Sequence, residues 1–191
     1  MPDNFFIHNH LLQGARYSES PNQSERPAAT DIDLLIIHNI SLPPGEYGTG
    51  CIDQLFCNEL IIQQHPYFSQ LENLKVSAHL LIERSGAMTQ FVPFNAKAWH
   101  AGDSVYEGRS GCNDFSIGIE LEGSDFEAFA DVQYRMLTVV TKLLLAEYPC
   151  LNPDRIVGHS DVAPDRKTDP GPYFDWSRYQ HSLAETNSPE S

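Results

Sequence analysis

The segment Ile32-Asp33-Leu34-Leu35-Ile36-Ile37-His38 constrains the fold more than any other stretch of this chain. It is nearly continuously apolar and lacks the polar–apolar alternation of a strand that has one face in water. This pattern is typical of a β-strand buried on both faces. We therefore expect a sheet with covering layers on both sides, and a strand that ends at His38.

Other segments supply further strands and the covering helices. Val76–Glu83 and Ala87–Val92 are strand-like runs that flank Arg84-Ser85-Gly86, a turn sequence that predicts a β-hairpin. A short strand is expected over Arg155–Gly158. Apolar residues at helical spacing predict three helices, over Ile52–Gln64, Asp131–Tyr148 and Phe174–Leu183. The apolar stripe expected on the second helix consists of Val132, Met136, Val140 and Leu143/Leu144.

A strictly alternating strand is expected over Phe115–Leu121. Its apolar residues face the core, while Ser116, Gly118 and Glu120 share the opposite face. Two small residues beside a carboxylate leave room for another group to approach Glu120.

These elements predict a single domain of the α/β (α+β) class, in which a central mixed β-sheet is flanked by helices. A chain of 191 residues fits one domain with tails. We expect residues 1–30 to form a polar, irregular N-terminal arm over the domain, ordered mainly around Phe5–Leu12. Residues 31–183 form the domain, and 184–191 a disordered tail.

The composition restricts the partners of this chain. A formal net charge of −14 argues against nucleic acid and against an anionic membrane surface, because both need clustered Lys and Arg. A small soluble substrate is the expected partner. The N-terminus lacks a basic start and an apolar signal core, which predicts a cytoplasmic protein. In that reducing compartment Cys51, Cys57, Cys112 and Cys150 are expected to be buried free thiols, since they form no CxxC pair.

His38 and His159 stand out among the eight histidines because each ends an apolar run and precedes a loop. Ligands in α/β sheets bind beyond the carboxyl ends of the strands. A catalytic zinc takes three protein ligands, often two histidines and a carboxylate. The residues alone leave Asp161, Asp165 and Asp169 as alternatives for that carboxylate. The other histidines are expected to be structural or at the surface, and His79, in a strand, is expected to be a satisfied core residue.

Two further residues could carry chemistry near such a metal. Lys167 lies two positions before Asp169, so both side chains point the same way if the loop is extended. An ammonium there could stabilise an oxyanion, whereas an isolated lysine is more often a solvated surface residue. Glu120 could act as a general base or acid, or could simply be an edge-strand charge.

Several motifs occur together, in order, and carry a family resemblance. They are His38-Asn39, Val76–His79, Ala98–Gly102, Asn113–Leu121, Gly158–Asp161 and Asp165–Gly171. In these motifs the chain, from about Asp31 to Tyr179, resembles the type-2, AmpD-like N-acetylmuramoyl-L-alanine amidases, a family similar in fold to peptidoglycan recognition proteins.

The resemblance implies a role for particular residues. The family's ligands for one Zn²⁺ per chain fall on His38, His159 and Asp169. Its catalytic acidic residue falls on Glu120 and its catalytic lysine on Lys167. Residues that bind substrate fall on Asn39, Lys75 and Trp99. At Lys75 the family often has an arginine that contacts the peptide carboxylate; lysine lacks the bidentate fork, so peptide selectivity is expected to differ.

The implied activity is zinc-dependent hydrolysis of the amide between the lactyl group of (1,6-anhydro-)N-acetylmuramic acid and L-alanine. The expected setting is cytoplasmic peptidoglycan recycling, with a soluble anhydro-muropeptide as substrate and a monomeric enzyme. A non-catalytic muropeptide-binding module is the first alternative, disfavoured because all five metal and catalytic positions are filled. An exported cell-wall lysin is the second, disfavoured by the N-terminal sequence and the acidic charge.

Overall fold

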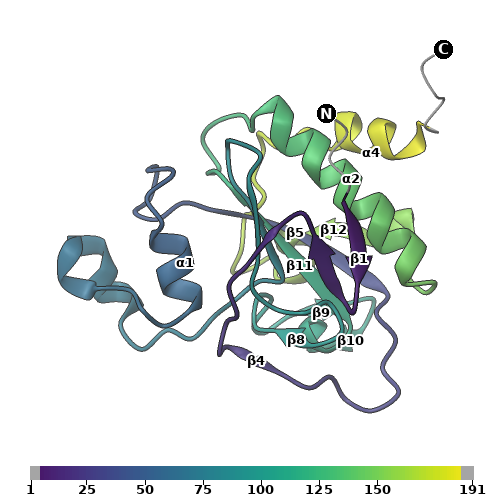
Figure 1. Ribbon diagram of the computed structural model, residues 1–191, viewed down its shortest axis with the longest axis horizontal. Coiled ribbons are helices and arrows are strands. Elements are labelled where there is room, and N and C mark those ends of the chain that lie inside the picture. The colour runs from purple at the N-terminus through teal and green to yellow at the C-terminus, as the bar shows by residue number, and fades with distance from the viewer. Residues whose placement is uncertain (1–4, 186–191) are drawn as a thin grey trace.

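A computed structural model describes residues 5–185 as a six-stranded mixed sheet with helices on both faces (Figure 1). Across the sheet the strands are β12 (Ile156–Gly158), β5 (Leu34–Ile40), β11 (Ser116–Glu122), β6 (Leu80–Ile82), β7 (Met88–Gln90) and β3 (Arg16–Tyr17). The first four are parallel, β7 is antiparallel to β6, and β3 is parallel to β7. The predicted fold class is confirmed, including the β6–β7 hairpin. The strand expected to end at His38 continues to Ile40.

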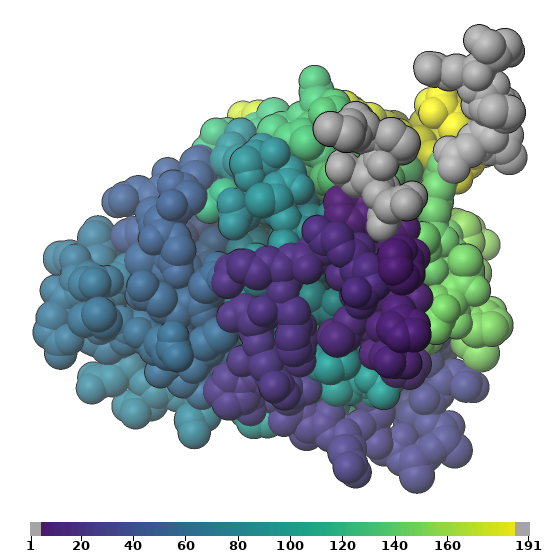
Figure 2. All heavy atoms as spheres, viewed as in Figure 1, coloured from purple at the N-terminus to yellow at the C-terminus, as the bar shows by residue number. Residues whose placement is uncertain are grey.

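Three two-stranded ribbons surround this sheet. They are β1 (Phe6–His8) with β2 (Leu11–Gln13), β4 (Gln23–Ser24) with β8 (Lys97–Ala98), and β9 (Val105–Tyr106) with β10 (Arg109–Ser110). Within residues 5–30 the expected N-terminal arm contains four short strands, β1 to β4, so it is more ordered than predicted. This segment spreads over one face of the molecule (Figure 2) and adds β3 to the edge of the main sheet, because its backbone groups find partners there.

The helices lie on both sides of the sheet. Helices α2 (Asp131–Glu147) and α4 (Trp176–Ala184) cover one side, α1 (Cys51–Phe56) covers the other, and the short α3 (His159–Val162) follows β12 (Figure 1). Residues 5–185 also contain four 3₁₀ segments, at Ile62–Gln64, Pro66–Leu71, Cys112–Asp114 and Pro153–Arg155.

Helix α1 is shorter than the predicted helix over Ile52–Gln64. Asn58 adopts a left-handed conformation with φ of 60°, which stops the helix just after Phe56. Its side chain pairs with that of Asn22 from the N-terminal segment. The tertiary contact therefore overrides the apolar spacing that favoured a longer helix.

Helix α2 lies where it was predicted, but its buried face is rotated from the expected stripe. Val140 and Leu144 are buried, whereas Val132 and Met136 are only half-buried. Tyr134, Leu137 and Thr141 lie at the centre of the buried face instead. Polar Thr141 is tolerated there because its hydroxyl is hydrogen-bonded to that of Tyr179 on α4, 2.6 Å away.

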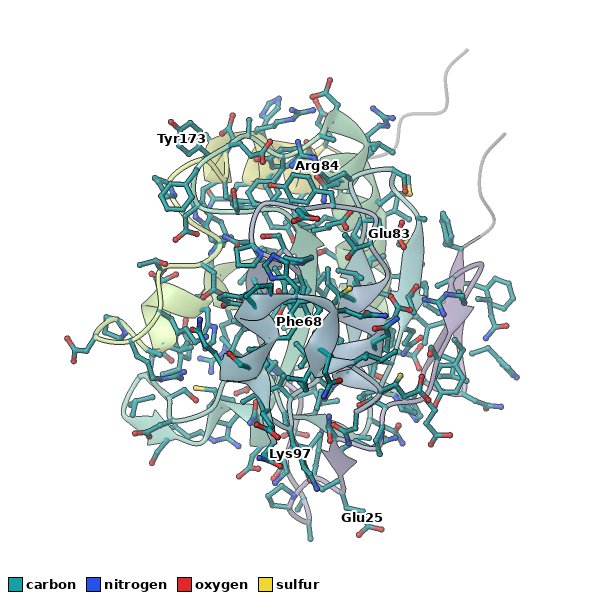
Figure 3. All side chains as sticks on the ribbon, turned by 90° about the vertical axis from the view of Figure 1, so that its left-hand side faces the viewer. Glu25, Phe68, Glu83, Arg84, Lys97 and Tyr173 are labelled. Carbon is teal, nitrogen blue, oxygen red and sulfur yellow. The ribbon has the colours of Figure 1, made fainter. Side chains whose placement is uncertain are left out.

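The alternation of β5 places its side chains in different cores. Leu35 and Ile37 pack against α2, while Leu34 and Ile36 face the opposite side of the sheet. On that opposite side Phe68 is buried under a 3₁₀ turn, near the centre of the view in Figure 3. His38 lies on the same side of β5 as Leu34 and Ile36. It therefore faces the side of the sheet that α1 covers, next to the loop that follows β12.

Two other expectations concern the cysteines and the C-terminal tail. Cysteines 51, 57, 112 and 150 are all free, as predicted, but only Cys51 and Cys112 are buried. Residues 186–191 of the expected disordered tail lie outside the described residues, and Ala184 is the last residue of α4. Within residues 5–185, none of the helices has both the length and the apolar character needed to span a membrane.

Candidate metal centre and active site

The register of the parallel strands assembles the centre of the site. Glu120 on β11 is the direct partner of His38 on β5, and both belong to the side of the sheet away from α2. On the other side of β5, Gly158 pairs with Ile37. His159, the next residue, therefore lies beside His38.

His38, His159 and Asp169 present three ligand atoms to a common point. The distances His38 Nδ1–His159 Nδ1, His38 Nδ1–Asp169 Oδ2 and His159 Nδ1–Asp169 Oδ2 are each 3.0 Å. Tetrahedral Zn²⁺ with bonds near 2.0–2.1 Å separates its ligand atoms by roughly 3.3 Å. The three side chains therefore fit a zinc ion, and they are the group of described residues that could hold one.

The two other candidate carboxylates do not join this group. Asp161 Oδ2 accepts a hydrogen bond of 2.7 Å from the backbone N–H of Gly158, which turns it back towards its own helix. Asp165 is exposed at the surface. Asp169 is held in place by its backbone, since its carbonyl accepts a 3.0 Å hydrogen bond from Ser160 N–H.

Hydrogen bonds at the far ring nitrogens orient both histidines. His159 Nε2 lies 3.1 Å from the carbonyl of Ala101, which can only accept, so the proton sits on Nε2 and leaves Nδ1 for a metal. His38 Nε2 lies 3.0 Å from His100 Nδ1. Both nitrogens that face Asp169 are thus suited to act as metal ligands.

Burial sets the charge states of this cluster. Burial lowers the pKa of His38 to about 4, although Asp169 opposes the shift, so the ring is neutral at pH 7. Burial also raises the pKa of Asp169, but its close contacts with His159 and His38 outweigh the effect of burial and hold that pKa well below its usual range. A neutral imidazole beside a carboxylate is the charge state that binds a cation.

Glu120 lies in a polar but desolvated position beside these residues. Its side chain is 9% exposed, and its Oε2 is buried with no hydrogen-bond partner among the described residues. Burial, followed by the negative charge of Asp169, raises the pKa of Glu120 well above its usual range, while Lys167 opposes the shift. An unpartnered carboxylate of raised pKa is suited to exchange a proton with a bound substrate or water.

Lys167 is half-buried and comes from the loop that carries Asp169. It lines the same cavity as Glu120 and His38, and its positive charge lowers the pKa of both. The backbone N–H of Lys167 donates a 2.9 Å hydrogen bond to the carbonyl of Ala163. Lys167 is therefore part of the site rather than a solvated surface lysine.

The site opens into two connected hollows. A cavity of about 240 Å³ holds the three metal-ligating side chains together with Glu120 and Lys167. A larger groove of about 710 Å³ shares Lys167 and Asp169 with it and continues past Ser124 and the exposed Phe126. Together they give an extended ligand access to the metal position from outside.

The three predicted substrate-binding residues lie in different places. Asn39 lines both hollows, but its amide N–H groups donate to Asp125 Oδ1 at 2.7 Å and to the carbonyl of Pro170 at 3.0 Å. The indole N–H of Trp99 donates to Ser24 Oγ at 3.3 Å. Lys75 is exposed and lines a separate hollow of about 320 Å³ beside α1.

His79 is a core residue, as the sequence predicted. Its side chain is fully buried, Nδ1 accepts a 3.0 Å hydrogen bond from Gly118 N–H, and Nε2 lies 3.1 Å from the carbonyl of Ala96. His100, in contrast, contacts the metal-ligating cluster, and the sequence assigned it no function. The small face Ser116–Gly118 was a signal for it, since a Cβ at Gly118 would lie 2.4 Å from the His100 ring.

Comparison with known proteins agrees with this geometry. The chain is 51% identical over 177 residues to the 1,6-anhydro-N-acetylmuramyl-L-alanine amidase AmpD of Haemophilus influenzae, covering 93% of this chain and 96% of that protein. A crystal structure of a selenomethionine derivative of AmpD superposes with a TM-score of 0.91 and 49% identity, covering 93% of this chain and 99% of the other.

A structure of lower sequence identity has the same fold as this chain. It is the amidase AmiD of Escherichia coli in complex with anhydro-N-acetylmuramic acid-L-Ala-D-gamma-Glu-L-Lys, with a TM-score of 0.59 and 26% identity. The match covers 93% of this chain and 65% of that one. The sequence profile described as N-acetylmuramoyl-L-alanine amidase matches residues 28–172, which include every residue of the metal-ligating cluster and both predicted catalytic residues. This chain therefore belongs to the N-acetylmuramoyl-L-alanine amidase family.

Proposed function

We propose that this enzyme is a zinc-dependent amidase that acts on 1,6-anhydro-muropeptides. The bond broken is the amide between the lactyl group of 1,6-anhydro-N-acetylmuramic acid and L-alanine. The observation that carries the proposal is the triangle of His38 Nδ1, His159 Nδ1 and Asp169 Oδ2 beside the unpartnered carboxylate of Glu120. The similarity to AmpD supports the choice of substrate.

His38, His159 and Asp169 would hold the zinc ion. Bound there, zinc supplies Lewis acidity, which polarises a carbonyl oxygen and makes water more acidic. Glu120 accepts a proton from the attacking water and orients that water towards the amide carbon. The ammonium of Lys167 stabilises the negative charge that develops on the carbonyl oxygen.

Glu120 then completes the reaction by returning the proton to the nitrogen of L-alanine as the C–N bond breaks. The same carboxyl group thus serves first as base and then as acid, for which a raised pKa is suitable. The products are 1,6-anhydro-N-acetylmuramic acid, with a free lactyl carboxylate, and the peptide, with a free amine.

We further propose that the enzyme works in the cytoplasm as a monomer, on soluble recycled muropeptides. A net charge of −14 supports a small soluble substrate over an anionic polymer, because repulsion weakens a stable grip on such a surface. We assign substrate contacts to Asn39, Lys75 and Trp99. In this assignment the ammonium of Lys75 pairs with a peptide carboxylate, without the bidentate geometry of an arginine.

The test is mass spectrometry of anhydro-muropeptide incubated with the purified protein, before and after metal removal by a chelator and after zinc is added back. We expect release of free peptide that stops on chelation and returns with zinc. Activity that survives complete metal removal would refute the zinc mechanism. A protein that binds zinc and the muropeptide without cleaving it would be the binding module. Equal rates on intact cell-wall sacculi and on soluble muropeptide would indicate a lysin.

A further inference from the structure

We propose that His100 is a positioning residue that fixes the orientation and tautomer of the metal ligand His38. This inference rests on the zinc site of the proposed function. The evidence is a chain of hydrogen bonds that leads from His38 through His100 and Ser116 to the backbone of Cys112.

The direction of this chain is determined by its last member. The carbonyl of Cys112 can only accept a hydrogen bond, and it lies 2.6 Å from Ser116 Oγ, so the hydroxyl proton of Ser116 points at it. The oxygen of Ser116 is then an acceptor for His100 Nε2, which lies 3.2 Å away. His100 therefore carries its proton on Nε2.

The same reasoning determines the tautomer of the metal ligand His38. A neutral imidazole with its proton on Nε2 accepts at Nδ1, and His100 Nδ1 lies 3.0 Å from His38 Nε2. His38 consequently keeps its proton on Nε2 and directs the lone pair of Nδ1 at the metal position that it shares with His159 Nδ1 and Asp169 Oδ2. Partners of this kind raise ligand basicity and hold the ring in position.

Packing leaves His100 few other orientations. A Cβ on Gly118 would lie 2.4 Å from the ring, so glycine at this strand position provides the space that His100 fills. The backbone N–H of His100 donates to Asn113 Oδ1 at 3.1 Å. His38 and His100 meet edge to face, with ring centroids 5.0 Å apart. The room that the sequence left beside Glu120 is thus partly occupied by a residue that serves the metal ligand.

Two substitutions separate hydrogen bonding from packing. His100→Phe keeps a ring beneath Gly118 and removes the acceptor, whereas His100→Asn keeps an acceptor near the Nδ1 position and removes the ring. We expect His100→Phe to weaken zinc binding by about 10- to 100-fold, measured by competition with a chromophoric chelator, and His100→Asn to recover most of that affinity. Wild-type zinc affinity in His100→Phe, or the reverse order of the two variants, would overturn the proposal.

A second experiment uses the zinc-loaded wild type, so it does not depend on whether a variant folds. Long-range ¹H–¹⁵N spectra should show the His100 proton on Nε2 and an acceptor-type Nδ1; a proton on Nδ1 would overturn the assignment. Neither experiment depends on catalysis. If the wild type binds zinc tightly but releases no peptide, the amidase activity is refuted. The role of His100 is then still decided by the zinc affinities and the spectra.

Discussion

Glu120 is the residue on which the proposed chemistry depends most directly. Its Oε2 is buried without a hydrogen-bond partner in the part of the chain that the structure describes. This arrangement costs stability, and proteins keep such groups mainly where they serve a function. Its position on β11 opposite His38 is dictated by strand register, so it approaches the metal position on a rigid element rather than on a loop.

Replacing Glu120 by Gln should keep the shape of the site and remove its proton acceptor. We expect turnover to fall by about two to four orders of magnitude, because the variant can neither accept nor return the proton. Zinc content, measured by atomic emission, should stay at the wild-type level. Turnover within a few-fold of wild type would show that another group acts as the base.

Lys167→Ala should lower turnover by about two to three orders of magnitude, because the developing negative charge on the carbonyl oxygen loses its cationic partner. The comparison is steady-state kinetics on anhydro-muropeptide at saturating zinc. Lys142→Ala, on α2 on the side of the sheet away from the site, is the matched control and should retain wild-type rates. Full activity of Lys167→Ala would rule out its oxyanion role.

Among the elements, the N-terminal segment differs most from a simple arm. Asn22 is 1% exposed and connects three parts of the chain. Its side-chain N–H groups donate to the carbonyl of Val76 at 2.8 Å and to Asn58 Oδ1 at 2.9 Å. In this way the segment secures the end of α1, which covers the side of the sheet where the site lies.

Asn22→Ala should destabilise the fold by about 2–3 kcal/mol, because it leaves the amide of Asn58 and nearby backbone carbonyls without partners. Urea unfolding followed by circular dichroism measures the change. Glu25→Ala, on an exposed part of the same segment, is the control and should change stability by less than about 0.5 kcal/mol. Equal stabilities of the two variants would mean that the segment lies on the domain without supporting it.

At the scale of the whole molecule, several buried neutral histidines link stability to pH. Burial, with the charge of Arg26, lowers the pKa of His79 to about 3, against 6.5 for the unfolded chain. The unfolded state therefore binds a proton that the folded state does not, and the stabilisation present above pH 6.5 is lost as pH falls towards 3. Glu120 has the opposite effect, because its pKa is raised in the folded state. Above the ordinary pKa of a glutamate, its contribution to stability falls as pH rises.

The contribution of His79 can be isolated by difference. Between pH 6.5 and 4 the unfolding free energy of wild type should fall more steeply with decreasing pH than that of His79→Asn, by up to about 1.4 kcal/mol per pH unit. Both proteins are measured by urea unfolding in excess chelator, so that metal binding does not contribute. Parallel pH profiles would show that His79 has an ordinary pKa in the folded state.

The sequence by itself determined the framework of this protein. An apolar run that ends in His38, an alternating strand that carries Glu120 and a stiff loop with Lys167 and Asp169 predicted a covered mixed sheet. Their motifs also resemble one amidase family. Strand periodicity and motif spacing could be read without coordinates because they are local properties of the sequence.

Only the tertiary structure decided which groups meet. His100 and Ser116 are separated by a loop, yet a 3.2 Å contact joins them beneath His38, and Asn58 ends α1 in contact with distant Asn22. The residues alone left three aspartates open, and family resemblance chose Asp169; the geometry that brings Asp169 Oδ2 within 3.0 Å of both histidines depends on strand register and loop path. Such contacts arise from the packing of segments far apart in sequence, so no local pattern encodes them.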